Sequence, residues 1–210
     1  MKYIILLMLV TLFSCQEKQE VRPVVKTKVV VRKEVKQKIY LFGLGDVPSK
    51  NIDFVKKELV SFYNYDVVVL PNQEIPKTLM VQGINKYQAN NILDYLDSTY
   101  KKYDGKVLAI TNVNICTDRE LNGIIYKNWS IFGLGKLGGK SCVVSTNRMG
   151  KKYKDRLAKV TIHEIGHTLG LHHCENDEHC LMNDAKGKGK KVDDEKKWMC
   201  NKCRNKIKLK

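Results

Sequence analysis

The stretch His163-Glu164-Ile165-Gly166-His167-Thr168-Leu169-Gly170-Leu171-His172-His173-Cys174 has the pattern HExxHxxGxxHC. On a helix, His163 and His167 are four residues apart and project from one face, so both can reach a single ion. Glu164 lies beside them, where it can act on a water molecule rather than on the metal itself. Apolar residues at helical spacing predict that this helix packs against a core: Ala158, Ile162, Ile165 and Leu169.

The second half of the pattern adds a third nitrogen ligand. Gly170 lets the chain leave the helix through a backbone conformation that other residues resist. The turn then returns His173 to the ion that His163 and His167 share. Three histidines with an open fourth position are typical of a catalytic zinc site rather than a closed structural one. A bare HExxH also occurs by chance in amphipathic helices, but the added glycine and histidine make coincidence rare.

Cysteine motifs follow directly. Cys174 ends the first pattern, Cys180-Leu181-Met182 has the form CxM, and after a further seventeen residues Cys200-Asn201-Lys202-Cys203 has the form CxxC. Together these motifs resemble the signature of the archaemetzincin family, and the resemblance covers roughly the last fifty residues. It implies a zinc-dependent peptidase with an α+β, zincin- or metzincin-like fold: a mixed twisted sheet, flanking helices and an HExxH active-site helix.

One spacing departs from the family pattern. Five residues, 175–179, separate Cys174 from Cys180, where the family has four. Either the loop carries one extra residue, or His179 replaces Cys180 as a ligand. Cys180 is the better candidate, because the CxM motif and the spacing to CxxC both count correctly from it.

The four cysteines suit a tetrahedral thiolate zinc site: Cys174, Cys180, Cys200 and Cys203. The alternative is two disulfides, as in many proteins outside the cytoplasm. The family resemblance favours zinc, and so implies two zinc ions, one catalytic and one structural, with residues 174–210 as a zinc-stabilised loop region. It also implies that Met182 is the methionine of a Met-turn, a thioether floor under the imidazoles and not a ligand.

The N-terminus predicts export. Residues 1–14 combine Lys2 with an apolar run that is too short to span a bilayer, as in a secretory signal. Leu-Phe-Ser before Cys15 resembles a bacterial lipobox, with cleavage before Cys15 and lipid on its sulfur. We therefore expect a lipid-anchored protein of the bacterial cell envelope, outside the cytoplasm. The alternative is a plain signal peptide with an incidental cysteine, and the membrane and leaflet stay open.

Residues 15–38 are polar and basic, which predicts a tether, although alternating valines leave a strand as the alternative. Residues 39–210 are long enough for one catalytic domain with a proper core. The formal net charge of +16 invites anionic partners. Because the lysines are scattered and an export signal is present, we expect a solvated surface near an anionic membrane, no nucleic-acid partner and a monomer.

The domain body alternates strands and helices. Strands are expected at 38–44, 66–70, 106–113, 129–134 and 141–146, with helices after Pro48, near Ala89 and from about Lys151. The apolar run 66–70 predicts a strand covered on both faces. The order is similar to the upper half of metzincins. Cys116 and Cys142 are either a disulfide pair or two buried thiols.

The segment 129–134 has a second expected role. In metzincins the strand before the last one forms the sheet edge above the cleft, where an extended peptide pairs with it. That resemblance makes these residues a substrate-binding edge: Trp129, Ser130, Ile131, Phe132, Gly133 and Leu134. Gly133, Gly135 and Gly138 also match a dinucleotide motif, but a strand follows instead of a helix, so a flexible turn is the better interpretation.

These patterns predict a zinc metallopeptidase in which Glu164 is the general base and peptides or proteins are the substrates. The rival is a catalytically inactive, lipid-anchored zinc module that binds peptide or an anionic surface. Glu164 argues against it, because binding alone needs no carboxylate beside the ligands. Cleavage specificity and the choice between endopeptidase and aminopeptidase stay open.

Overall fold

The computed structural model describes residues 36–209. The signal, Cys15 and nearly all of the tether lie outside the described residues. Residues just before β1 already contact the domain: Lys36 Nζ donates to Asn64 Oδ1 at 2.9 Å, and the backbone N–H of Asp66 donates to Gln37 O. Its elements in chain order are β1 (Lys38–Leu44), α1 (Ser49–Tyr63), β2 (Asp66–Val69), η1 (Lys77–Leu79), β3 (Tyr87–Gln88), α2 (Ala89–Thr99), β4 (Lys106–Thr111), β5 (Ile115–Leu121), β6 (Ile124–Ile131), β7 (Gly133–Gly135), β8 (Ser141–Ser145), η2 (Gly150–Lys152), α3 (Tyr153–Thr168), α4 (Gly189–Asp194) and α5 (Asn201–Lys206).

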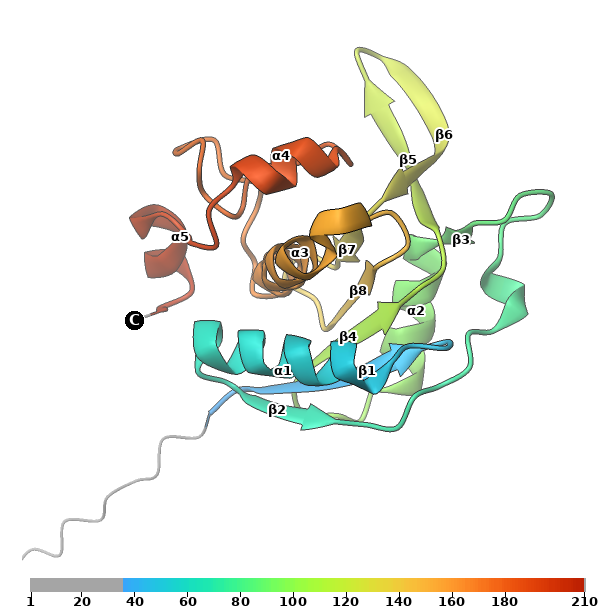
Figure 1. Ribbon diagram of the computed structural model, residues 1–210, viewed down its shortest axis with the longest axis horizontal. Coiled ribbons are helices and arrows are strands. Elements are labelled where there is room, and N and C mark those ends of the chain that lie inside the picture. The colour runs from blue at the N-terminus through green and yellow to red at the C-terminus, as the bar shows by residue number, and fades with distance from the viewer. Residues whose placement is uncertain (1–35, 210) are drawn as a thin grey trace, which may run out of the picture. The chain divides into compact units, whose positions relative to one another are not determined.

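A five-stranded sheet forms the centre of the domain, in the order β2-β1-β4-β8-β7 (Figure 1). Its first four strands are parallel, and only β7 runs antiparallel to its neighbour β8. A smaller sheet, β3-β5-β6, is built around the β5–β6 hairpin, which projects beyond the main sheet (Figure 1). The expected mixed sheet with flanking helices is therefore confirmed.

The main sheet separates two apolar cores. Residues of successive strand positions alternate between them, as the two-residue period of a strand requires. In β4, for example, Leu108 and Ile110 join the core under α1 and α3, while Val107 and Ala109 join the core under α2. The active-site helix α3 thus packs on one face of the sheet, with α1 beside it, and α2 covers the other face (Figure 1).

Strand β2 corrects one expectation. Its apolar sequence predicted burial on both faces, yet Val68 and Val69 are 39% and 42% exposed. The reason is topological, because β2 is the edge strand and pairs only with β1. An apolar run of this length cannot distinguish a central strand from an edge strand.

The segment 129–134 is also corrected, because it is not one strand. Residues 129–131 end β6, which pairs antiparallel with β5, whereas Gly133 and Leu134 belong to β7 at the edge of the main sheet. Phe132 lies between the two strands and is 6% exposed. Its burial anchors the passage from one sheet to the other. Only β7 is therefore placed at the main-sheet edge beside α3.

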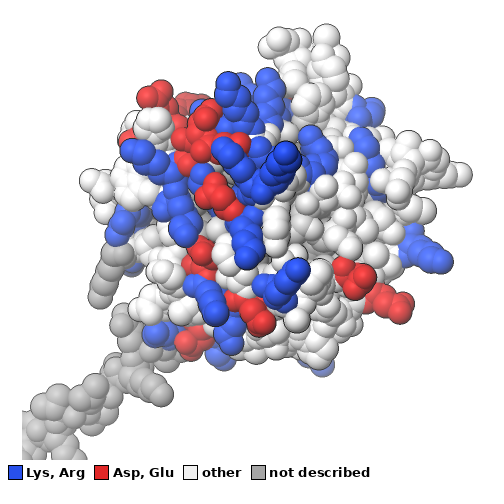
Figure 2. Space-filling view, viewed as in Figure 1, with Lys and Arg blue, Asp and Glu red and all other residues white. Residues whose placement is uncertain are grey.

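Basic side chains do not gather in one patch on the face seen in Figure 2. They are spread over this face and interspersed with acidic residues, in agreement with the expected scattered surface. None of the helices within residues 36–209 is long and apolar enough to cross a membrane.

The C-terminal region has little regular structure and is held to the domain by buried apolar residues and by polar contacts. Arg156 on α3 makes a two-pronged ion pair with Asp193 on α4, with Nε–Oδ1 and Nη2–Oδ2 distances of 2.8 Å. Both side chains are mostly buried, at 17% and 13% exposure. The hydrogen bonds from Arg156 lower the pKa of Asp193 from 3.8 to about 2. This pair fixes α4 against the active-site helix.

We expect Asp193→Asn to reduce the free energy of unfolding by about 1–2 kcal/mol at pH 7. Because the folded-state pKa is depressed, the stabilisation is complete above about pH 4 and is lost as the pH falls through about 2. Urea unfolding of both proteins checks this, and the difference between them should shrink in acid. The neighbouring exposed Asp194→Asn is the matched control, and equal losses for the two variants would contradict the prediction.

Candidate active site and metal centres

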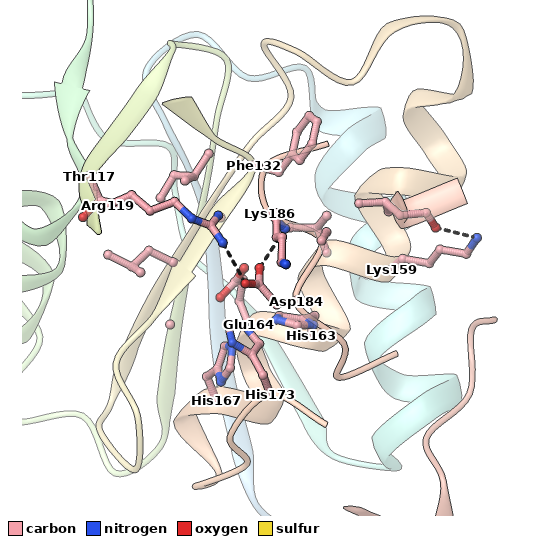
Figure 3. Close-up of a pocket in the computed structure, with 18 of the residues that line it drawn as sticks. Thr117, Arg119, Phe132, Lys159, His163, Glu164, His167, His173, Asp184 and Lys186 are labelled. Atoms are coloured by element: carbon pink, nitrogen blue, oxygen red, sulfur yellow. Dashed lines mark hydrogen bonds and ion pairs between the residues drawn. The ribbon is translucent and has the colours of Figure 1, made fainter. Parts of the chain in front are cut away.

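Three histidines meet at the end of α3. His163 and His167 come from its last turns, and His173 returns after the helix, so that one ligand nitrogen from each lies within 4.8 Å of the others. Gly170 makes this return with φ of +91°, a conformation that other residues seldom adopt. The expected trio is therefore brought together, and Figure 3 shows the three rings gathered below Glu164.

Backbone carbonyls orient two of the three rings. The Nδ1 atoms of His163 and His167 lie 2.7 Å from Leu181 O and Leu171 O. A carbonyl can only accept, so each Nδ1 carries the proton and each Nε2 keeps its lone pair for a metal. Burial lowers the pKa of His163 to about 3 and that of His167 to about 4, so both rings are neutral at physiological pH. Neutral imidazoles with free Nε2 atoms fit a zinc ion.

Glu164 is buried next to this trio. It is 6% exposed, and burial raises its pKa from 4.5 to about 8. A hydrogen bond from the backbone N–H of Gly135 acts in the opposite direction and lowers this pKa. A dication at the histidines would pull this pKa down again by direct attraction. A carboxyl group whose pKa can be tuned to near neutrality suits a general base.

Two glycines of β7 let the sheet edge approach α3. A Cβ atom on Gly133 would lie 2.6 Å from Glu164 Oε1, and one on Gly135 would lie 2.4 Å from Glu164 O. Neither glycine has a positive φ, so the requirement here is space alone. Two glycines of the pattern that resembles a dinucleotide motif, Gly133 and Gly135, thus allow the sheet edge to contact Glu164.

We expect Gly133→Ala to lower kcat/KM for peptide hydrolysis by about 10- to 100-fold, because the added methyl group displaces the Glu164 carboxylate. Steady-state kinetics on a fluorogenic peptide measures this. Gly139→Ala is the control for a similarly crowded methyl group away from Glu164, since its Cβ would lie 2.6 Å from Lys136 Cγ. Equal activity in the two variants would show that the approach of β7 is not required.

The four C-terminal cysteines form a second cluster. Their sulfurs lie within 4.8 Å of one another, with Sγ–Sγ distances of 3.7 Å for Cys174–Cys200 and 3.9 Å for Cys180–Cys203. Four sulfurs at about 2.3 Å from a tetrahedral zinc are separated by about 3.8 Å. A disulfide needs about 2.05 Å. The spacing therefore fits zinc and not two disulfides.

Other sulfur and nitrogen candidates fall outside this cluster. His179 is half exposed, so Cys180 and not His179 completes the group of four. Cys116 and Cys142 are buried free thiols among the described residues, which answers the question of a disulfide between them. His172 is exposed beside His173.

Met182 is fully buried under the active-site helix. A Cβ atom on Gly166 would lie 2.6 Å from its sulfur, so the absence of a side chain at Gly166 makes room for the thioether. The preceding residue links the two clusters: Leu181 O faces His163 Nδ1, while the N–H of Leu181 donates to Trp198 O at 2.8 Å. The first histidine is thus held by the chain segment that carries the cysteines.

The histidines open into a cavity of about 440 Å³ that also contains residues not predicted from the sequence. Arg119 on β5 reaches across to Asp184, with Nη2–Oδ2 at 2.8 Å (Figure 3). Asn122-Gly123 at the hairpin tip was a usable signal for β5–β6, because Asn-Gly favours a two-residue turn. No sequence signal marks Asp184, whose partner is distant in the chain. Lys159 and Glu195 also line this cavity.

A helix that presents two histidines and a carboxylate, followed by a turn that returns a third histidine, beside an antiparallel sheet edge defines a metallopeptidase of the zincin type. The chain belongs to peptidase family M54, whose sequence model matches residues 67–209. It is accordingly a zinc-dependent metallopeptidase.

The chain is similar to archaemetzincins over most of their length. The archaemetzincin of Halobacterium salinarum is 29% identical over 184 residues, covering 81% of this chain and 99% of the relative. That of Natronomonas pharaonis is 30% identical, covering 78% and 95%. The crystal structure of archaemetzincin from Archaeoglobus fulgidus complexed with malonate is 29% identical with a TM-score of 0.66, covering 81% of this chain and 99% of that one. The Methanopyrus kandleri structure is 26% identical with a TM-score of 0.68, covering 85% and 97%.

Proposed function

We propose that His163, His167 and His173 hold the catalytic zinc and that Glu164 is the general base in the hydrolysis of peptide bonds. The observation that supports this most is the convergence of three histidine nitrogens within 4.8 Å, two of them on rings fixed by carbonyls. Zinc supplies a Lewis acid that polarises a scissile carbonyl and acidifies water. Glu164 accepts the proton of the attacking water and passes it to the leaving amine.

The free edge of β7 is the proposed site for the substrate backbone. Phe132 O accepts from Ser145 N, and the N–H of Lys136 donates to Ser141 O, so alternate residues of this segment face β8. The backbone groups of Gly133 and Gly135 then face away from β8; the N–H of Gly135 faces Glu164, and the groups of Gly133 are proposed to pair with the substrate. An extended peptide pairs with such an edge whatever its side chains are. Residues 129–131 are not part of this proposed edge, because Arg148 Nη1 already donates to Ser130 O at 2.7 Å.

A second, structural zinc is proposed at Cys174, Cys180, Cys200 and Cys203. Sulfur spacing close to that of a tetrahedral thiolate site supports it. This region has only short helices, so it gains much of its order from a metal. Metal analysis should give two zinc ions per chain, and one zinc with no titratable thiols would support disulfides instead.

Digestion of a peptide library tests the catalytic proposal. The full-length, zinc-loaded protein should cleave peptides, and a chelator should abolish cleavage until zinc is restored. The same digestion separates internal cleavage from removal of N-terminal residues, which distinguishes an endopeptidase from an aminopeptidase. Peptide binding without cleavage in the zinc-loaded protein would favour the inactive binding module.

We propose in addition that residues 1–14 are removed, that Cys15 carries lipid, and that residues 16–35 tether a monomeric catalytic domain to a membrane of the bacterial cell envelope. The motif Leu-Phe-Ser-Cys supports this. Growth with a labelled fatty acid should label the wild-type protein and not Cys15→Ala, and only the wild type should sediment with membranes. Label that survives Cys15→Ala would reject the anchor, and light scattering of the soluble variant checks the monomer.

A further inference from the structure

The cavity at the histidines continues along α3 toward the start of the helix. Lys159 precedes His163 by four residues, so it lies about one turn, roughly 6 Å, further along the same helix face. Figure 3 shows Lys159 at the far side of this pocket from His167 and His173. Val192 and Glu195, at the end of α4, line the same part of the cavity. Lys159, Val192, Glu195 and the three histidines thus line one cavity.

Glu195 is an unpaired buried carboxyl group in this part of the cavity. It is 5% exposed, and its Oε1 atom has no hydrogen-bond partner among the residues that the structure describes. Burial raises its pKa from 4.5 to about 7. A buried carboxylate without a partner is costly, so it gains from any ligand that brings a hydrogen-bond donor.

The neighbouring charges leave room for a cation. Lys159, the nearest buried lysine, is already engaged, because its Nζ lies 2.8 Å from Asp155 Oδ2 and 3.1 Å from Val192 O. The other charged groups that act on Glu195 are Lys191, Asp184 and Asp194. With Lys159 offset by Asp155, Asp184 by Arg119 and Lys191 by Asp194, an ionised Glu195 is the charge left without compensation. A cationic side chain therefore fits better than an acidic one.

We propose that Glu195 is a specificity-determining residue, which receives the substrate side chain next to the scissile bond and selects lysine or arginine there. The inference rests on the proposed function, since it names the substrates that the same cleft accepts. The aliphatic part of a lysine or arginine side chain would lie against Val160 and Val192, which line the cavity, while its charged end reaches Glu195. A charge-assisted hydrogen bond to a buried carboxylate is among the stronger single contacts in a protein.

Cleavage profiling of the full-length, zinc-loaded protein is the first test. Peptides are randomised at both positions that flank the scissile bond. We expect lysine and arginine to exceed leucine by about tenfold or more in kcat/KM on one side. In Glu195→Gln the ratio should fall to within about threefold. Glu178→Gln, whose side chain is 83% exposed, is the matched control and should keep the wild-type profile.

Binding provides a second readout that does not depend on turnover. Peptide hydroxamates that carry lysine, arginine or leucine as the first side chain are titrated by calorimetry into zinc-loaded wild type and Glu195→Gln. Tighter binding of the basic ligands to wild type alone supports the assignment. Equal or better binding of the leucine ligand to wild type would overturn it, as would an unchanged lysine preference in a folded Glu195→Gln.

The two proposals fail in different ways. Cleavage without a preference for basic residues would reject the role of Glu195 and leave the peptidase intact. Binding that prefers lysine without any cleavage would reject the peptidase proposal and leave the role of Glu195 intact. The cleavage profile and the ligand binding of the wild type can each contradict the role of Glu195, so the test does not depend on whether the variant folds.

Discussion

Glu164→Gln should lower kcat/KM for peptide hydrolysis by about 10²- to 10⁴-fold, the usual contribution of a positioned general base. The amide keeps the shape of the side chain and can still face the N–H of Gly135 through its oxygen. It cannot accept a proton from water, so the loss falls on the chemical step. Zinc content should be unchanged, because the carboxylate is not among the converging ligand nitrogens. Steady-state kinetics with metal analysis on the same sample measures both quantities.

Glu175→Gln is the matched control, since that glutamate is exposed on the loop after Cys174. It should leave both activity and zinc content at wild-type values. A Glu164→Gln enzyme that cleaves peptides at the wild-type rate would show that another group accepts the proton. Loss of zinc together with activity would instead place Glu164 among the groups that keep the metal site intact.

If the proposed structural zinc is bound by the four cysteines, Cys200→Ser should remove it and destabilise the protein by at least about 3 kcal/mol, a fraction of the roughly 10–16 kcal/mol that structural zinc gives to zinc-finger peptides. For a domain of this size, the corresponding fall in Tm is about 6–12 °C. Cys200 is 4% exposed and lies within one cluster with three other sulfurs, so serine leaves the cluster with three thiolate ligands instead of four. Zinc stoichiometry and thermal unfolding followed by circular dichroism measure the effect.

Cys116→Ser is the control for the loss of a buried thiol, because Cys116 lies on β5 outside the cluster. It should keep two zinc ions and most of the Tm. A reductant and a chelator separate the two chemistries: a chelator should reproduce the Cys200→Ser phenotype and a reductant should not. The opposite result would assign the four cysteines to disulfides.

The periodic elements of the fold could be predicted from the sequence. Helix α3 has both apolar spacing and a metal-binding pattern, and β1 appears at its predicted bounds. The differences lie in short apolar segments, because the sequence of such a segment does not show which strands lie beside it. The run 66–70 predicts a strand covered on both faces, but β2 is a partly exposed edge strand, and residues 129–134 cross between two sheets. The β5–β6 hairpin was missed although Asn122-Gly123 marks its turn.

The site divides in the same way. Residues whose chemistry depends on local spacing, such as His163 with His167 or Cys200 with Cys203, can be identified from sequence, because one helix turn or one tight turn brings them together. Arg119 with Asp184 joins a hairpin to a distant loop, so their contact depends on the whole fold. Glu195 is unusual only because it is buried, and burial of a single glutamate has no pattern in the sequence.

The position of Leu181 between the two clusters bears on how the enzyme matures. The residue after Cys180 holds His163 through its carbonyl and the Cys200 segment through its N–H. Outer contacts of this kind change metal affinity by about 10- to 100-fold. A newly made chain that has not yet acquired its thiolate-bound ion would therefore hold its first histidine loosely. We therefore expect the catalytic metal to be bound more weakly until the C-terminal segment has folded.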